Sequence, residues 1–334
     1  MTSSTQRPEI IVFHYRFSPF AKRITWYLTL RGIPYSECLQ PPTMPRPDIH
    51  ALGTQYRRIP IVLIGRDIYH DTRLILQKLE DLYPERPKIS GGAAQSGIEK
   101  LLEMWTVDGL FARAAQLLPL DLPLLRDPKF TSDREDYTGR SWERESLEKG
   151  RPEALVAFKG AFEMVERGFL GDGREWILGG EGPSLADIEA IWPFHWLTTL
   201  PGALPPDYIS AQQFPHTYAW ISRFDQATRL AGKKIPKPVL LSGAEVLEKV
   251  SAADFVEGDE CVDVQDPTGL QRGQEVEVWP IDTGMRRRDR GVLRGLSTRE
   301  IVIESKTKGG VRVKIHTPRH GFRIRGVGGK SSRL

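Results

Sequence analysis

The stretch YRFSPFAKRITWYL, residues 15–28, decides how the N-terminal part of this chain folds. It begins where the β-type run EIIVFHY (9–15) ends, turns at a Ser-Pro pair, and continues with the apolar period of an amphipathic helix. We therefore expect a strand, a tight turn and a helix, with the Ser18 hydroxyl at the helix N-terminus. Backbone N–H groups point outward at that end of a helix and favour an anion.

The chain around this stretch alternates strands and helices in the order of a small α/β domain. After the first helix, the sequence predicts a strand at 35–40, a hairpin at 57–70 that turns at Gly65, and a helix at 71–84. Pro60 interrupts the apolar run IPIVLI. Because a central strand resists proline, we expect Pro60 at the first residue of a strand with a cis bond; a trans edge proline is the alternative.

Three regions of the chain differ in pattern, and we expect them to be three domains. Residues 8–87 form the α/β domain, and residues 93–240 have the pattern of amphipathic helices. Within the helical region, residues 126–150 are too charged for a simple turn, which indicates a functional or partner-facing insertion or a disordered one. Residues 255–328 alternate with period two between Gly-rich turns, which predicts a small β-barrel or sandwich.

The composition is that of a soluble globular protein. Of 334 residues, 40% are hydrophobic and 27% charged, and no apolar run approaches the roughly 18 residues of a membrane span. The first residues lack the apolar run of a secretory signal, and the two cysteines, Cys38 and Cys261, lie too far apart for a zinc or disulfide pattern. We expect a reduced, cytoplasmic protein. Positive charge is concentrated toward the C-terminus, because residues 268–334 contain 16 Lys or Arg and only 6 Asp or Glu.

Three motifs in order give the chain a family resemblance. RFSPFAKR resembles the omega-class active-site motif of cytosolic glutathione transferases, with serine where that class has cysteine, and it also matches the tau-class Ser-Pro-Phe pattern. RRIPIVLIGRDIYHDTRLILQKLEDLYP is similar to the cis-proline strand and acid-hydroxyl pair of the family, and SLADI to the capping box of its helical domain. The resemblance covers about residues 9–240 and implies a thioredoxin-like domain followed by an all-α domain. The insertion and the β tail together resemble fungal relatives.

The resemblance also implies an activity. Ser18 would stabilise the thiolate of glutathione, the co-substrate, for attack on a small hydrophobic electrophile or for a glutathione-dependent isomerisation. The glutathione-binding residues would be Phe20, Arg58, Ile59, Pro60, Asp71 and Thr72. Secondary candidates are the second hydroxyl of Tyr15 and, facing the electrophile, Trp105, Asp108, Phe111 and Arg113. A homodimer is implied as well.

Several of these residues also have a plain structural interpretation. Ser18 and the Asp71-Thr72 pair are favoured helix N-caps in any protein, and Tyr15 fits a half-buried aromatic side chain at the end of a strand. His316 and His320 are spaced like a metal pair, but on alternating strands that spacing indicates satisfied or surface side chains, so we expect no metal.

The basic run RRRDR, residues 286–290, allows a solvated loop, a protein partner or anionic ligand, or nucleic acid. No aromatic RNA-binding motif or zinc-finger spacing accompanies it, so nucleic acid is the least favoured. Two rivals to the transferase hypothesis remain. One is a non-catalytic transferase-like scaffold that binds a protein through its basic β region, and the other is a glutathione-independent enzyme of specialised metabolism.

Overall fold

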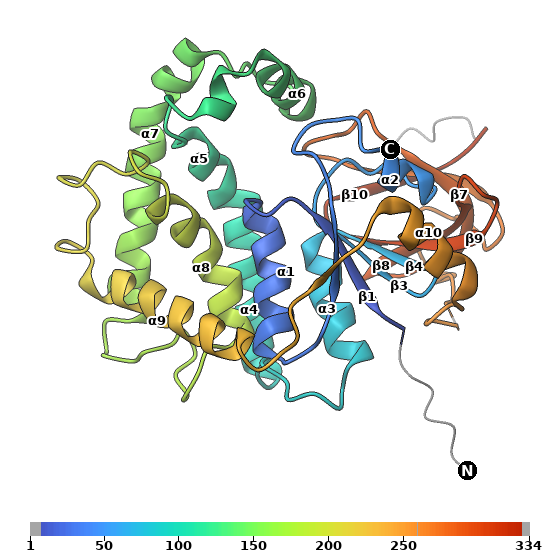
Figure 1. The fold of residues 1–334 in the computed structure, drawn as a ribbon, viewed down its shortest axis with the longest axis horizontal. Helices are drawn as coiled ribbons and strands as arrows, with labels where there is room; N and C mark the ends of the chain where they lie inside the picture. Colours follow the sequence, from blue (N-terminus) through green and yellow to red (C-terminus); the bar gives the residue numbers. More distant parts are fainter. Residues whose placement is uncertain (1–7, 259, 329–334) are drawn as a thin grey trace.

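The N-terminal region has the strand and helix order expected from its sequence, in a computed structural model that describes residues 8–258 and 260–328. Its elements are β1 Ile10–His14, α1 Pro19–Leu30, β2 Ser36–Leu39, α2 Pro47–Ala51, β3 Ile61–Ile64, β4 Asp67–His70 and α3 Thr72–Leu82. Strand β1 pairs in parallel with β2 and antiparallel with β3, which pairs antiparallel with β4. Figure 1 shows α1 and α3 between these strands and the rest of the helices, so the start of α1 lies where the two regions meet.

Two turns of this region confirm what the sequence predicts. Gly65, between β3 and β4, has a φ of +60°, and a Cβ at this position would lie 2.4 Å from the carbonyl oxygen of Asp254. Only glycine fits both conditions. The Ile59–Pro60 bond is cis, and Pro60 stands directly before β3, where its missing N–H removes no ladder hydrogen bond.

The second region is all helical between 93 and 232. Its elements are α4 Ala93–Met104, η1 Trp105–Leu110, α5 Phe111–Gln116, η2 Pro123–Arg126, α6 Pro128–Thr138, α7 Arg144–Glu163, η3 Met164–Phe169, α8 Leu185–Thr198 and α9 Pro215–Gly232. Helix α8 is its buried centre and begins with a capping box in which the Ser184 N–H donates to Asp187 over 2.8 Å. The helix continues through Pro193 to Thr198, so that proline does not end it. Among the described residues, no helix is long and apolar enough to cross a membrane.

The charged insertion folds as a helix rather than as a disordered loop. Helix α6 lies in it, and α7 begins before it ends. The carboxylate of Asp133 in α6 accepts from the backbone N–H of Met44 over 2.9 Å and pairs with Arg57 over 2.9 Å. Arg57 also binds Asp136, one turn further along α6. The insertion therefore packs on the N-terminal region beside the segment that leads to Pro60.

The C-terminal β-strand region is present, and its strands extend the sheet of the N-terminal region. After β5 Val239–Leu240 and α10 Gly243–Ala252 come β6 Glu275–Pro280, β7 Asp289–Leu296, β8 Glu300–Lys306, β9 Arg312–Pro318 and β10 Phe322–Gly326. Strand β9 pairs in parallel with β4, with Ile68 opposite Ile315. One sheet results, in the order β10-β6-β7-β8-β9-β4-β3-β1-β2-β5. These strands thus continue an existing sheet edge.

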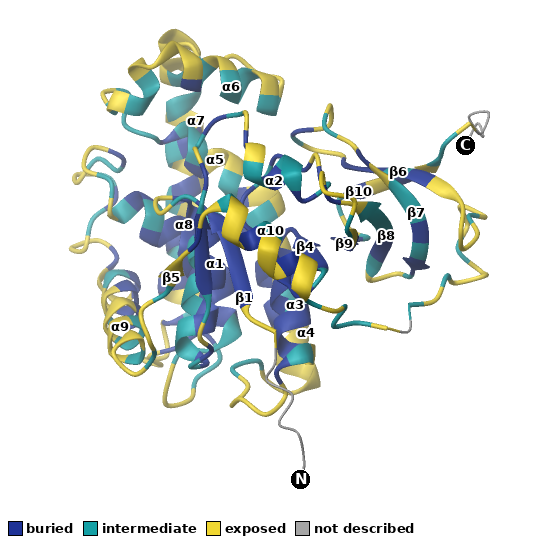
Figure 2. Cartoon of the chain, turned by 45° about the vertical axis from the view of Figure 1, so that its right-hand side comes forward, coloured by how far each residue is buried: buried dark blue, intermediate teal, exposed yellow. Residues whose placement is uncertain are grey.

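Two apolar cores lie on opposite faces of this sheet, because successive strand residues point to opposite faces. In β1, Ile10 and Val12 pack with α1, α3 and the helical region, whereas Ile11 and Phe13 pack with α2, α10 and the C-terminal strands. Figure 2 shows the buried strands and α1 at the centre and the C-terminal strands at one end of the molecule. The C-terminal region therefore completes the core on the face that α2 alone would leave open.

Candidate functional site

Sheet register brings the Ser-Pro turn, the cis-proline segment and the Asp71-Thr72 pair to one edge of the N-terminal domain. Phe13 of β1 is paired with Ile61 of β3, and Ile61 is paired with His70 of β4. These three paired residues lie at one end of their strands. Just beyond them, β1 leads to Ser18, cis-Pro60 leads into β3, and β4 leads to Asp71. The starts of α1 and α3 therefore open toward the same place as the backbone of Ile59.

Ser18 is the N-cap of α1. Its hydroxyl oxygen accepts from the backbone N–H of Ala21 over 3.2 Å, and its own N–H donates to the carbonyl of Tyr15 over 3.0 Å. The residue is buried, at 2% exposure. Capping uses the oxygen of the hydroxyl as an acceptor, so its O–H remains a donor. The structural role and a chemical role are thus compatible. The ring of Tyr15 packs against Phe17, with centroids 4.7 Å apart.

Asp71 and Thr72 begin α3. Asp71 has a φ of +63°, rare for a residue with a side chain, and its carboxylate caps the helix by accepting from Arg73 N–H over 3.1 Å. Burial acts to raise the pKa of Asp71, but the guanidinium groups of Arg73 and Arg58 hold that pKa below its ordinary value. The Thr72 hydroxyl accepts from Arg23, which also pairs with the buried carboxylate of Glu189 in α8. Arg23 thereby ties the starts of α1 and α3 to the helical region.

Arg58 stands next to Ile59 and is held by Asp71 and by the loop that follows β6. Its guanidinium lies 3.5 Å from the Asp71 carboxylate, binds the Asp282 carboxylate, and donates to the carbonyl of Thr283 over 2.8 Å. Asp282 and Thr283 belong to the loop between β6 and β7. Sequence reasoning missed them, because the segment DTGM carries only a turn signal and nothing in it points to a residue 224 positions away.

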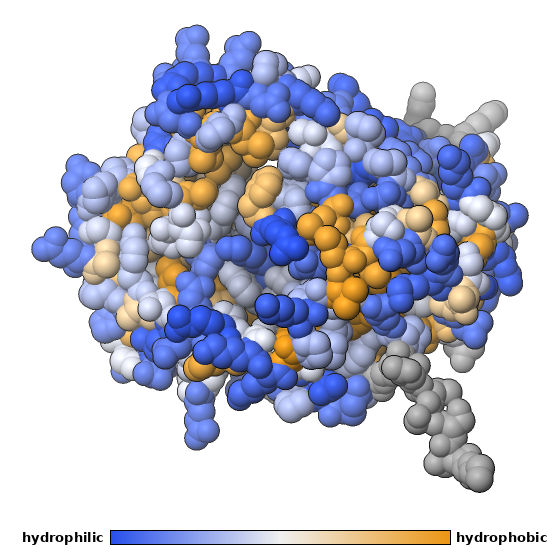
Figure 3. Space-filling view, viewed as in Figure 1, coloured by the Kyte–Doolittle hydropathy of each residue, from blue (hydrophilic) through white to orange (hydrophobic). Residues whose placement is uncertain are grey.

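Aromatic side chains pack together beside the start of α1, where Phe20 follows Ser18 by two residues. The ring of Phe20 lies 4.6 Å from those of Phe111 and Trp192, and Phe111 also stacks on Trp196 at 5.8 Å. Figure 3 shows the surface hollowed between the start of α1 and the helices α5 and α6, with apolar side chains along the hollow. Phe20 and Phe111 therefore lie in contact near the start of α1.

The other three helical-domain candidates divide between two places. Asp108 binds Arg73 of α3 and His320 of the C-terminal region, the latter over 3.0 Å, and so joins the polar groups near Asp71. Trp105 and Arg113 instead line a groove against α7 and η3, which contains neither Ser18 nor Asp71. Their helical spacing places them on the opposite side of η1 and α5 from Phe111.

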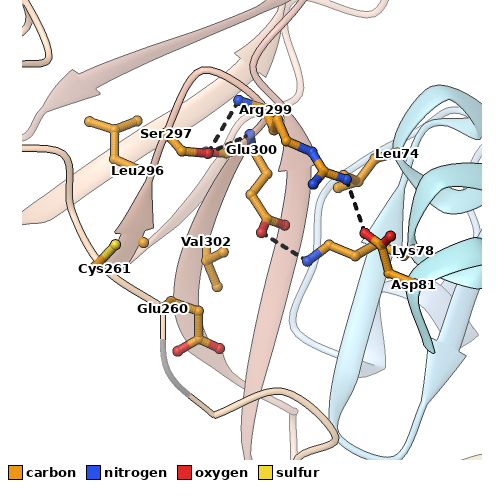
Figure 4. Close-up of a pocket in the computed structure, with 11 residues that line it drawn as sticks. Leu74, Lys78, Asp81, Glu260, Cys261, Leu296, Ser297, Arg299, Glu300 and Val302 are labelled. Carbon is orange, nitrogen blue, oxygen red and sulfur yellow. Dashed lines mark hydrogen bonds and ion pairs between the residues drawn. The ribbon is translucent and has the colours of Figure 1, made fainter. Parts of the chain in front are cut away.

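A separate cavity lies between α3 and the C-terminal strands, drawn in Figure 4. Its charges are paired with one another, Lys78 with Glu300 over 2.8 Å and Arg299 with Asp81 over 3.0 Å. Close by, His316 groups with the carboxylates of Asp67, Glu257, Glu260 and Glu300 at metal-ligand spacing. The ammonium groups of Lys78 and Lys314 bind three of these carboxylates, so the cluster is an ion-pair network within the protein. None of the predicted site residues lies here.

Much of the basic run at 286–290 is also used within the molecule. Arg286 pairs with Asp136 over 3.0 Å, and Arg288 pairs with Glu277 over 3.1 Å and covers the ring of Trp279. Asp289 is buried at the start of β7. These contacts attach the loop to α6 and to its own strands.

Comparisons with known proteins agree with this architecture. Residues 12–87 match the family model for the glutathione S-transferase N-terminal domain, and residues 113–233 match a domain of unknown function. A GST-like protein from Pseudomonas syringae superposes with a TM-score of 0.69 at 23% identity, covering 95% of this chain and 99% of that chain. A tau-class glutathione S-transferase from mango, Mangifera indica, gives a TM-score of 0.50 at 12% identity, covering 72% of this chain and 98% of that one. A rice glutathione S-transferase in complex with glutathione gives a TM-score of 0.50 at 17% identity, covering 73% of this chain and 97% of that chain.

A thioredoxin-like domain joined to an all-helical domain, with a site where the two meet, defines the glutathione transferase fold. Residues 12–87 match the N-terminal domain of that family, and the chain as a whole has its fold. The match over 95% of the chain includes most of the C-terminal β-strand region, whereas the plant proteins match at most 73%. The β-strand region is thus an addition to the fold that the Pseudomonas protein shares.

Proposed function

We propose that this protein binds glutathione at the joined starts of α1 and α3, and that Ser18 stabilises its thiolate for attack on a small hydrophobic electrophile. The observation that carries this proposal is the row Phe13, Ile61 and His70, which aligns three motif segments at one edge of the sheet. The same site would serve a glutathione-dependent isomerisation, because both reactions begin from the thiolate.

The electrostatics of α1 suit a thiolate. A glutathione thiol has an unperturbed pKa near that of cysteine, about 8.5, so little thiolate exists at neutral pH. The Ser18 O–H would donate to the sulfur, and the N-terminal end of a 12-residue helix adds partial positive charge. Lowering the thiol pKa by two units requires about 2.7 kcal/mol of differential stabilisation, within reach of these two effects together.

The remaining contacts would hold an extended peptide. The backbone of Ile59, beside cis-Pro60, would pair with the cysteinyl backbone as an added strand does. The start of α3 would receive the γ-glutamyl group, its carboxylate at Thr72 and its amine at Asp71. Arg58 would face the glycyl carboxylate. Phe20 and Phe111 would contact the electrophile, with Tyr15 and Asp108 at the margin of the site.

Calorimetric titration of glutathione into the full-length protein, with thiolate absorbance followed against pH, tests this proposal. Saturable binding with a thiol pKa below that of free glutathione is expected, whereas S-methylglutathione should bind without the absorbance change. No binding at millimolar glutathione would contradict the proposal. A non-catalytic scaffold is the second candidate, favoured by the binding of Arg58 to Asp282; it predicts no turnover even where glutathione binds.

We also propose that the protein is a cytoplasmic homodimer and that the regions 8–87, 93–240 and 255–328 are its domains. The exposed apolar side chains of Ile98, Leu101 and Met104 along α4 support a dimer contact on that helix. Sedimentation equilibrium should give twice the chain mass, and Leu101→Glu should shift it toward the monomer. An unchanged monomer mass in the parent protein would contradict the dimer.

A further inference from the structure

The loop between β6 and β7, residues 281–288, covers the part of the site where Arg58 lies. Asp282 binds Arg58, and the backbone N–H of Gly284 donates to the carbonyl of Tyr137 in α6 over 2.8 Å. Arg286 then pairs with Asp136 over 3.0 Å. Figure 1 shows this loop beside the segment before β3 and close to α6. The loop is therefore held on both sides, by the N-terminal domain and by the insertion.

Several guanidinium groups around this place are already paired with carboxylates of the protein, and Lys100 and His320 pair with two of the same carboxylates. The guanidinium groups are those of Arg23, Arg58 and Arg73, and the carboxylates that bind them are those of Asp71, Glu103, Asp108, Glu189 and Asp282. Arg58 already faces two of these carboxylates, Asp71 and Asp282. A third carboxylate at the same guanidinium would meet like charge at short range, which disfavours its binding.

We propose that Asp282 sets the specificity of the site at the far end of the thiol ligand, so that γ-glutamyl-cysteinyl peptides ending in an amide are preferred to glutathione with its free glycyl carboxylate. This inference rests on the proposed function, which places that end of the ligand at Arg58. An amide brings no charge, and its N–H donates to a carboxylate. The Asp282 side chain is 58% exposed, so the carboxylate is accessible to such a donor while it binds Arg58.

The test compares two ligands on two proteins. Glutathione and its glycyl amide are titrated calorimetrically, at low ionic strength, into the full-length protein and into Asp282→Asn. The parent protein should bind the amide about tenfold more tightly than glutathione, a difference of about 1.4 kcal/mol. Asp282→Asn should bind glutathione about tenfold more tightly than the parent protein does, because the substitution removes a negative charge. Its affinity for the amide should change little, because the asparagine keeps an acceptor oxygen.

Glu277→Gln is the matched control, because it removes a carboxylate of the same strand region that pairs with Arg288, away from Arg58. It should keep the parent preference. If glutathione and the amide bind the parent protein equally, or if Asp282→Asn leaves their ratio unchanged, the inference is overturned while the proposed function stands. If neither ligand binds any of the three proteins, both are overturned.

Discussion

The imidazole of His316 on β9 and the carboxylate of Asp67 on β4 lie 2.9 Å apart, from Nε2 to Oδ1, although 249 positions separate them in the sequence. Both side chains are fully buried. On its other side, His316 faces Glu300 over 3.4 Å, and Lys78 of α3 binds Glu300 in turn. The C-terminal strands are therefore held to the N-terminal sheet by buried charges as well as by backbone pairing.

This pair makes stability depend on pH. Burial acts to lower the pKa of His316, but hydrogen bonds to Asp67 and Glu300 raise it above its ordinary value. A raised folded-state pKa contributes stability that is complete below the unfolded pKa, about 6.5, and is lost as pH rises through the folded pKa. The free energy of unfolding, from urea titrations, should therefore fall as the pH rises above about 6.5.

His316→Asn should flatten that fall and lower stability by about 3 kcal/mol, because Asp67 is left buried without a cation. The exposed His216 provides the control, and His216→Asn should change stability by less than about 0.5 kcal/mol. If the free energy of unfolding depends on pH equally in the parent and His316→Asn proteins, His316 is not the cause of that dependence.

Asp289 predicts a second pH effect. Burial raises its pKa to about 6, against hydrogen bonds from Gln55 N–H and the Thr54 hydroxyl, while burial lowers the pKa of neighbouring His70 to about 3. A raised carboxyl pKa means that stability is complete below the unfolded value, about 3.9, and is lost as pH rises through about 6. Asp289→Asn should therefore be more stable than the parent at pH 7.5, by about 3 kcal/mol, and equal to it near pH 4.

Thermal or urea unfolding at the two pH values measures this difference. The side-chain amide that Asp289→Asn introduces could also donate to His70 Nδ1, which has no hydrogen-bond partner among the described residues. A variant that is less stable than the parent at pH 7.5 would show that the hydrogen bonds of the carboxylate outweigh its burial.

Ser18 and Ser242 allow capping to be separated from chemistry. Each caps a helix by accepting from the N–H three residues on, over 3.2 Å at α1 and 3.3 Å at α10. Both Ser18→Ala and Ser242→Ala should lose about 1 kcal/mol of stability. Only Ser18→Ala should also lose conjugation of glutathione to chlorodinitrobenzene, by about tenfold or more in kcat/KM, with the bound thiol pKa returning toward about 8.5. Equal activity in the two variants would remove Ser18 from the chemistry.

Arg23 and Glu189 form a buried pair whose loss should be asymmetric. Arg23→Met leaves the Glu189 carboxylate buried and unpaired, and should cost about 3 to 5 kcal/mol in unfolding free energy. The double variant Arg23→Met with Glu189→Leu should recover most of that stability, because no unpaired charge remains. Denaturant titrations of the parent, Arg23→Met and the double variant measure the loss of stability and its recovery. A double variant no more stable than Arg23→Met would show that the Thr72 contact of Arg23, and not the ion pair, carries the effect.

Local features of the fold could be predicted from the sequence because their causes lie within a few residues. The N-cap at Ser18, the glycine turn at Gly65 and the proline directly before β3 each follow from the conformational limits of one residue and its neighbours. Alternation of apolar residues marked the C-terminal strands as strands. Their pairing partners could not be predicted in the same way, since alternation says which face is buried and not which edge is paired.

The amino-acid sequence by itself determined the motif segments of the site, the helix N-termini that carry Ser18 and Thr72, and the strand character of the C-terminal region. Tertiary structure alone decided that β9 pairs with β4, that α6 packs beside Arg57, and that Asp282 binds Arg58. Helix periods and caps depend on contacts across about four residues, which a sequence displays directly. A salt bridge or strand pair between distant segments depends on which sheet edge stays open and which charge is left buried without a partner, and only the folded chain settles both.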